Sequence, residues 1–148
     1  MNKSYLLAAA VGLFATPVFS DGHATGDAEA GEAAFRQCQT CHVVQNDDGE
    51  VLAGRKAKTG PNLFGLTGRT AGTVDGFRYR PSIVEAGEGG LVWDEETFVA
   101  YVQDPTAFLR EVLDDDKARS GMSFKLRKEE DARNIWALIV SLSPEPES

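Results

Sequence analysis

Five consecutive residues, Cys38-Gln39-Thr40-Cys41-His42, constrain this chain more than any other stretch of its sequence. Two cysteines three positions apart, with a histidine directly after the second, form the attachment pattern of a c-type haem. Thiols at positions i and i+3 lie on one side of a helical turn, so both can reach the two vinyl groups of one porphyrin edge. His42 can then give its imidazole to the iron as the proximal ligand. The motif predicts one covalently attached haem c per chain.

Other uses of a cysteine pair fit the sequence less well. A structural zinc site needs four ligands, but the chain has only two cysteines and two histidines, and the second histidine is His23 near the N-terminus. A thioredoxin-like disulfide would need alternating strands and helices around the motif, and no such alternation is visible. A plain structural disulfide without haem stays open as an alternative.

The N-terminal residues 1–20 have the pattern of a secretory signal, with a basic start, an apolar run and small residues at its end. Cleavage is expected after Ser20 or after Ala24. An uncleaved membrane anchor is the alternative, but the apolar run from Leu6 to Val18 is shorter than the roughly 20 residues that a span needs. Because haem is attached to such motifs outside the cytoplasm, we expect a periplasmic protein.

The 148 residues suffice for one domain. We expect a flexible lead-in over 21–26, one all-α domain over 27–143 and an acidic tail over 144–148. Apolar spacing, capping residues and prolines predict the helices: from Asp27 to the haem motif, over 81–85, 94–104 and 105–112, and from about Lys128 to just before Pro144. No segment alternates as a strand, and the stretches 45–60 and 65–80 have the composition of loops.

Met122 is the candidate for the second axial ligand of the iron. After removal of the signal it is the only methionine, and it lies in the loop sequence Ser120-Gly121-Met122-Ser123-Phe124. Methionine paired with histidine is a common ligand set in c-type electron carriers. The alternative is a methionine that fills a gap in the core, but such a residue is expected on a regular element.

Taken in order, these motifs resemble a bacterial class I cytochrome c, and within that class the larger cytochrome c2 subgroup, over about residues 27–142. The resemblance implies a single-domain class I cytochrome c fold wrapped around the haem, in which Gly31 and Phe35 of the first helix cross Leu138 of the last. In that family, the position of Leu138 is often aromatic. The matching pieces are Gly31 to Phe35, Cys38 to His42, Lys58 to Leu63, Gly68-Arg69, Gly76 to Tyr79, Trp93 to Thr97, Tyr101 to Pro105, Met122 to Phe124 and Asn134 to Leu138.

The resemblance also implies roles for side chains around the haem. Pro61 would offer its carbonyl to the free ring N–H of His42, as the outer partners of metal ligands do. Tyr101 would place its hydroxyl near the Met122 sulfur, and Phe124 would cover the haem edge. Three further side chains would hydrogen-bond a haem propionate: Arg69, Tyr79 and Trp93.

Charge is distributed unevenly along the chain. Removing residues 1–20 deletes one base and no acid, so the formal charge of −8 becomes −9, which argues against a nucleic-acid partner. Residues 85–116 carry ten acids and one base, whereas 117–128 carry five bases and no acid. We expect the bases to surround the haem edge and the acids to lie opposite, although an ordinary solvated surface is the alternative. The expected docking residues are Lys56, Lys58, Arg119, Lys125, Arg127 and Lys128.

The expected function is a soluble periplasmic mono-haem electron carrier, a monomer that performs no bond chemistry. Its expected donor is a membrane cytochrome bc complex. Its expected acceptor is a photosynthetic reaction centre, a cytochrome oxidase or a denitrification reductase, and the sequence does not choose among them. The rival class is a haem peroxidase or a gas sensor, which would need an open iron position.

Overall fold

The computed structural model describes residues 24–143. The predicted signal peptide and the acidic tail over 144–148 lie outside the described residues. Seven elements follow one another along the chain: α1 (Ala28–Phe35), β1 (Val43–Gln45), β2 (Val51–Gly54), α2 (Pro81–Glu88), α3 (Glu95–Gln103), α4 (Pro105–Leu113) and α5 (Glu129–Leu142). None of the helices over 24–143 is long and apolar enough to cross a membrane.

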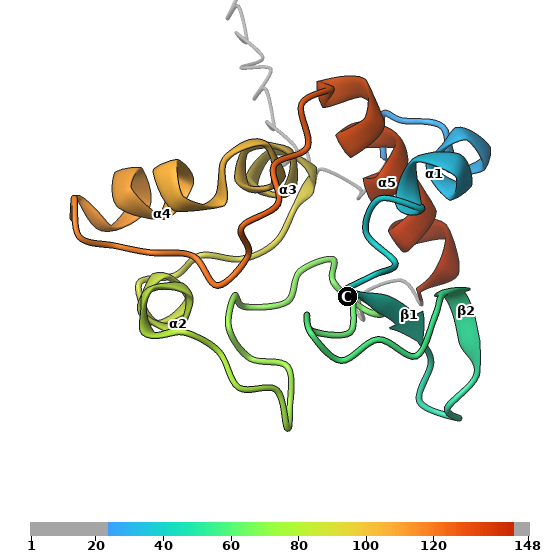
Figure 1. The fold of residues 1–148 in the computed structure, drawn as a ribbon, viewed down its shortest axis with the longest axis horizontal. Helices are drawn as coiled ribbons and strands as arrows, with labels where there is room; N and C mark the ends of the chain where they lie inside the picture. The colour runs from blue at the N-terminus through green and yellow to red at the C-terminus, as the bar shows by residue number, and fades with distance from the viewer. Residues whose placement is uncertain (1–23, 144–148) are drawn as a thin grey trace, which may run out of the picture.

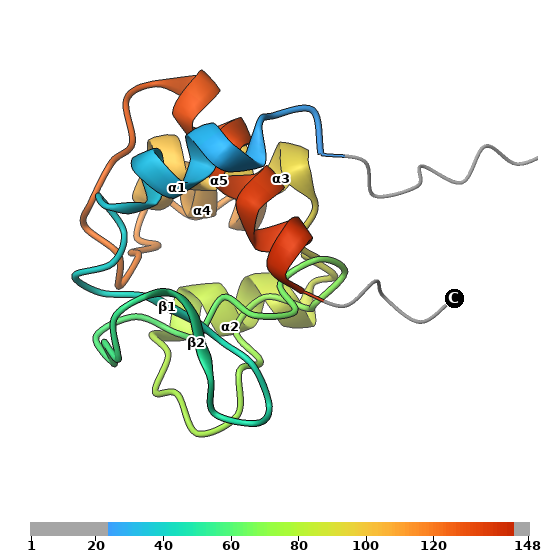
Figure 2. The same ribbon diagram turned by 90° about the vertical axis from the view of Figure 1, so that its right-hand side faces the viewer.

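The elements form two parts that face each other (Figures 1 and 2). Helices α1, α3, α4 and α5 lie together on one side, and α2, the β1–β2 hairpin and the loops between 55 and 80 lie on the other. Helix α5 packs against α1 and α3, while α4 packs against α3 and α2. The predicted mostly helical single domain is confirmed.

Capping residues explain why the helices begin where the sequence predicts. The Asp27 carboxylate accepts a hydrogen bond from the Ala30 N–H at 2.9 Å, which satisfies a free donor of the first turn of α1. Asp94 and Thr97 form a reciprocal capping box at the start of α3, with bonds of 2.8 and 3.0 Å. Helices α2 and α4 begin with proline as expected, and each extends slightly beyond its predicted end.

The crossing of the first and last helices is also confirmed. A Cβ atom at Gly31 would overlap the backbone carbonyl of Asn134 and would lie 2.9 Å from the Cβ of Leu138. Only glycine therefore permits this approach of α1 to α5. Phe35 and Leu138 are both buried at the crossing, so leucine fills a position that is often aromatic in the resembling family.

The prediction that no segment forms a strand is wrong, because part of the expected loop over 45–60 is a β-hairpin. Strand β1 pairs with β2 in antiparallel register, with a bulge between Val44 and Gln45. The turn closes through the Asn46 N–H, which donates to the Glu50 carbonyl at 3.0 Å, and through Gly49 at a φ of +83°. Strands of three and four residues are too short for alternation to stand out from a loop.

Several core residues also form the inner wall of the candidate site. Phe98 of α3 packs on Trp136 of α5, with ring centroids 5.3 Å apart. Phe98 and the neighbouring Ile135 face a central cavity, which is lined from the other part of the fold by Leu63 and Ile83. The hydrophobic core and the site are therefore one continuous apolar region.

Candidate haem-binding site

The two cysteines and the histidine of the motif lie in one tight turn. Helix α1 ends at Phe35, so Cys38 lies beyond the helix on which the sequence analysis placed it. The chain nevertheless continues in helical turns, because the Cys38 N–H donates to the Phe35 carbonyl at 2.8 Å and the His42 N–H donates to the Cys38 carbonyl at 2.9 Å. This turn brings Cys38, Cys41 and His42 to the wall of the same cavity.

Both cysteines are free thiols and half-buried. Burial raises the pKa of the Cys38 thiol to about 11, and the neighbouring Cys41 adds to the rise. Cys38 is therefore a neutral thiol near pH 7 in this state. Among residues 24–143 no three His, Cys, Asp or Glu side chains gather as they would around a metal ion. The pair is better suited to covalent attachment to an apolar ring than to zinc.

The His42 imidazole is oriented by Pro61. Its Nδ1 lies 2.9 Å from the Pro61 carbonyl oxygen. A carbonyl only accepts, so Nδ1 carries the proton and Nε2 keeps the lone pair that a metal ligand needs. Burial lowers the pKa of His42, and the bond to Pro61 opposes part of that shift, so the ring is neutral at pH 7. A Cβ atom at Gly60 would lie 2.6 Å from Nδ1, so glycine is needed for the chain to pass this close to the ring.

Met122 lines the same cavity, although 80 positions separate it from His42. It is half-buried, and its N–H donates to the Ser120 hydroxyl at 3.0 Å. The Tyr101 hydroxyl lies 2.9 Å from the same Ser120 oxygen. The family resemblance implies a hydroxyl close to the Met122 sulfur; here the hydrogen bond of Tyr101 is made to Ser120.

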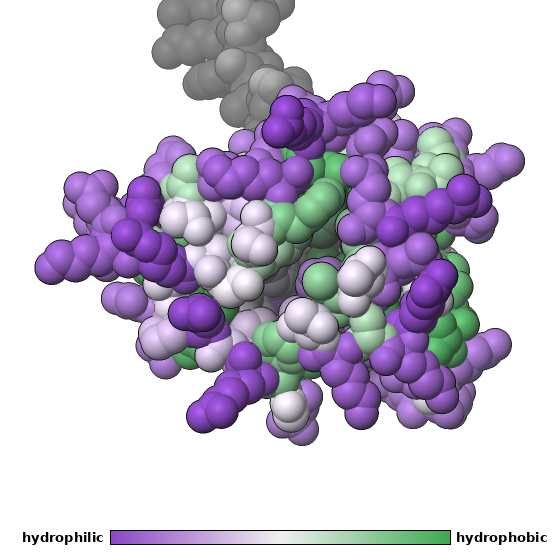
Figure 3. All heavy atoms as spheres, in the orientation of Figure 1, coloured by the Kyte–Doolittle hydropathy of each residue, from purple (hydrophilic) through white to green (hydrophobic). Residues whose placement is uncertain are grey.

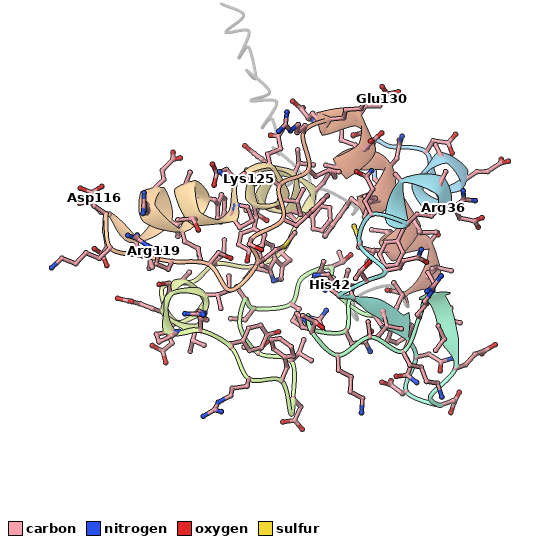
Figure 4. The ribbon with its side chains drawn as sticks, in the orientation of Figure 1. Arg36, His42, Asp116, Arg119, Lys125 and Glu130 are labelled. Atoms are coloured by element: carbon pink, nitrogen blue, oxygen red, sulfur yellow. The ribbon has the colours of Figure 1, made fainter. Side chains whose placement is uncertain are left out.

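The cavity that these residues share has a volume of about 590 Å³. That volume is within the range of roughly 300–1,000 Å³ of small-molecule and cofactor sites. Figure 3 shows this face hollowed near its middle, with apolar side chains in the hollow and polar side chains around it. Figure 4 shows His42 between the two parts of the fold. The size, apolar lining and paired thiols of the cavity all fit a porphyrin.

A half-buried guanidinium on the cavity wall also fits a porphyrin. Burial lowers the pKa of Arg69, and its one hydrogen bond among the described residues, Nη2 to the Asn62 carbonyl, is long at 3.4 Å. Within residues 24–143 no carboxylate forms an ion pair with Arg69. A buried cation without an acidic partner is costly, so an acid group on the bound molecule would suit it. Tyr79 and Trp93 line the same cavity.

All six predicted docking residues are exposed: Lys56, Lys58, Arg119, Lys125, Arg127 and Lys128. Phe124 of the cavity wall is 41% exposed. Two of the six bases, Arg119 and Lys125, also form contacts with residues of the acidic stretch.

The acidic stretch is not placed wholly opposite the bases, which corrects part of the expected charge separation. The Lys125 Nζ forms an ion pair of 2.6 Å with Asp104, a member of the acidic stretch. Arg119 donates to the Asp116 carbonyl at 3.1 Å, and Figure 4 shows the two residues together beyond the end of α4. Charge runs in the sequence did not reveal these contacts, because the chain turns back after α4.

Three residues at the site were not assigned a role from the sequence. Gly60 permits the approach to the His42 ring, Ser120 binds both Tyr101 and Met122, and Asn62 bridges the site to the β-hairpin. Gly60 lies in the matching stretch from Lys58 to Leu63, which was the only signal available for it. Ser120 bonds to Tyr101 and Asn62 to Gln45, and both partners are distant in sequence.

Comparison with known proteins identifies relatives over most of the chain, although no family model matches it. Cytochrome c2 of Rhodovulum adriaticum is 61% identical over 118 residues, which are 80% of this chain and 94% of the relative. Cytochrome c-551 of Roseobacter denitrificans is 48% identical over 143 residues, or 97% of each chain. The crystal structure of cytochrome c2 from Rhodobacter sphaeroides is 58% identical, with a TM-score of 0.79 over 82% of this chain and 99% of that chain.

The sequence identity, the agreement in fold and the arrangement of the cysteine motif around one cavity support the same conclusion. This chain belongs to the cytochrome c2 family of class I cytochromes c.

Proposed function

We propose that this chain is a mono-haem electron carrier whose haem c is bound covalently by Cys38 and Cys41 and ligated by His42 and Met122. One observation carries the proposal: all four side chains line a single cavity of porphyrin size. The membership of the cytochrome c2 family supports it. Bound haem c supplies a one-electron Fe(III)/Fe(II) couple, and its potential depends on the axial ligands and their surroundings.

The chain's own residues would bind, orient and shield the cofactor. The two thiols fix its position, and the Pro61 carbonyl holds His42 with Nε2 as the ligating nitrogen. Arg69, a half-buried cation on the cavity wall, would neutralise an acidic group of the haem. Phe124 at the rim would cover part of the haem edge while leaving a short path for an electron.

The rival function, a haem enzyme or gas sensor, requires a position on the iron that small molecules can reach. A methionine that reaches into the cavity favours the carrier. Two measurements test the proposal: a pyridine-haemochrome spectrum for haem c, and the far-red charge-transfer band of the oxidised protein for methionine ligation. An oxidised protein without that band, which binds cyanide quickly, would support the rival.

We also propose that residues 1–20 direct export and that the mature protein works in the periplasm. Its donor would be a membrane cytochrome bc complex, and its acceptor a reaction centre, a cytochrome oxidase or a denitrification reductase. Arg127 and Lys128 are exposed and line a second hollow that shares Gln37 and Phe124 with the cavity wall, which supports docking to acidic surfaces of such partners.

Charge reversal beside Phe124 would test the docking proposal. Replacing Arg127 and Lys128 by Glu should slow reduction by a cytochrome bc complex about tenfold at low salt, because local charges steer association. The matched control replaces Glu32 and Glu88 by Lys, two exposed acids outside the cavity wall, and should change the rate little. Stopped-flow rates at several salt concentrations measure both. Equal and opposite effects would show that net charge alone governs docking.

A further inference from the structure

We propose that Asn62 is a positioning residue that holds the Pro61 carbonyl against His42 and so helps to set the reduction potential. The proposal rests on the proposed function in one respect, because it takes His42 as the iron ligand. The uncharged Asn62 amide would control the hydrogen bond that orients the His42 imidazole, without a hydrogen bond of its own to that ring.

The side chain of Asn62 makes three hydrogen bonds to backbone groups. Its Oδ1 accepts from the Gln45 N–H at 3.0 Å and from the Phe64 N–H at 3.1 Å. Its Nδ2 donates to the Gln45 carbonyl at 2.7 Å. Both polar groups of Gln45's backbone are thereby paired with one side chain. The amide therefore joins strand β1 to the segment that contains Pro61.

Two backbone hydrogen bonds hold the same segments together on either side of the His42–Pro61 contact. The Gly60 N–H donates to the Cys41 carbonyl at 2.7 Å, and the Leu63 N–H donates to the Val43 carbonyl at 2.9 Å. Pro61 has no N–H and cannot add a bond of its own. The Asn62 side chain supplies the further bonds that keep this stretch in register with β1.

Asn62 is also linked to the cation of the site. Its carbonyl accepts the 3.4 Å hydrogen bond from Arg69. A shift of Asn62 would therefore change two contacts at once. It would move the carbonyl that orients His42, and it would weaken the hydrogen bond that the half-buried guanidinium donates.

The expected direction of the change in potential follows from ligand chemistry. A hydrogen bond from Nδ1 to a carbonyl raises the basicity of a metal-bound imidazole. A more basic ligand stabilises Fe(III) relative to Fe(II). Loosening the Pro61 carbonyl should therefore raise the reduction potential and expose the Nδ1 proton to exchange with water.

The experiment compares Asn62→Ala with Asn46→Ala in the haem-loaded protein. Asn46 is the matched control, because its side chain bonds only within the hairpin turn, to the Glu50 N–H at 2.8 Å and the Glu50 carboxylate at 3.3 Å. Two quantities are measured: the reduction potential, and the exchange rate of the His42 Nδ1 proton by NMR of the reduced state. Asn62→Ala should raise the potential and speed exchange about tenfold. Asn46→Ala should destabilise the hairpin and change neither quantity.

Equal changes in the two variants, or no change in Asn62→Ala, would overturn the proposal and leave Asn62 as a brace of the hairpin. If Asn62→Ala does not assemble with haem, Asn62→Asp replaces it. Asp keeps both acceptor contacts, but its second oxygen would face the Gln45 carbonyl, so repulsion between two acceptors replaces that hydrogen bond. Its exchange rate should exceed that of the wild type, and a wild-type rate would contradict the proposal. The wild-type spectrum tests His42 ligation separately.

Discussion

His42 and Met122 line the same cavity, but the segments that carry them are held by different kinds of contact. Around His42, backbone hydrogen bonds and the Asn62 amide join residues 41–45 to 60–64. Around Met122, most contacts are made by side-chain hydroxyls: Ser120 bonds to Tyr101 and to the Met122 N–H, and the N–H groups of Arg119 and Ser120 donate to Ser82 and Thr106. An exposed ion pair and one backbone bond, from the Leu126 N–H to the Val102 carbonyl, complete them. The proposed covalent attachment would strengthen the first segment further.

This difference implies that the Met122 side should release the iron first when the fold is stressed. Opening costs least where few buried backbone bonds must break. The segments would then have separate tasks: the His42 side keeps the cofactor in place, and the Met122 side sets whether the iron is closed.

Met122→Ala should have the largest effect, because it removes the proposed sixth ligand and leaves the His42 side intact. The reduced variant should bind carbon monoxide readily, and its potential should fall, since a methionine ligand raises it. Absorption spectra with carbon monoxide and a redox titration measure these changes. A wild-type protein that binds carbon monoxide as quickly as the variant would show that Met122 does not close the iron.

Gly60→Ala should damage the His42 side through overlap of the new Cβ with the imidazole ring. Overpacking of this kind lowers the free energy of unfolding by about 1–3 kcal/mol. Gly89→Ala is the control, since its Cβ would meet only carbonyls at 3.4 Å and its φ is −75°. Denaturant unfolding measures both, and equal losses would contradict the close approach at Gly60.

Ser120→Ala should loosen the Met122 side by removing the hydroxyl shared by Tyr101 and the Met122 N–H. A loss of about 1 kcal/mol from this segment should make cyanide bind to the oxidised protein about fivefold faster. Ser123→Ala tests the neighbouring loop position and should leave the rate unchanged. If both variants bind cyanide at the wild-type rate, Ser120 does not restrain the methionine.

Asp104→Asn should have the smallest effect, because the ion pair with Lys125 is exposed. The hydrogen bond from Lys125 and the Ala107 N–H lower the pKa of Asp104 in the folded protein. Its contribution is therefore present above the unfolded carboxyl pKa of about 3.9 and is lost as pH falls through the folded pKa. Melting temperatures should differ slightly between wild type and variant at about pH 6 and converge at low pH. A difference that persists in acid would contradict the ion pair.

The sequence predicted those parts of the fold that depend on local chemistry. Asp94 caps α3 as expected, α1 begins next to Asp27, where the helical pattern starts, and the proline at the start of α4 follows the end of α3. The cysteine motif predicted that its two thiols and its histidine lie on one cavity wall, because haem attachment requires this spacing. Met122 could be selected because the mature chain has no other methionine.

What the sequence could not predict depends on neighbours in space. The hairpin is too short for its pattern to be recognised, and Asn62 is an ordinary loop residue until Gln45 is beside it. Lys125 belongs to a basic run in the sequence, yet it pairs with an acid 21 positions away. The partner of the Tyr101 hydroxyl, Ser120, lies 19 positions away along the chain.

The mass of the intact protein, purified from the periplasm of cells that make c-type cytochromes, shows whether haem c is covalently attached to this chain. We expect a chain that lacks residues 1–20 or 1–24 and is heavier by one haem, with the added mass on the peptide that contains Cys38 and Cys41. A mature chain of unmodified mass, with both thiols free, would contradict covalent attachment.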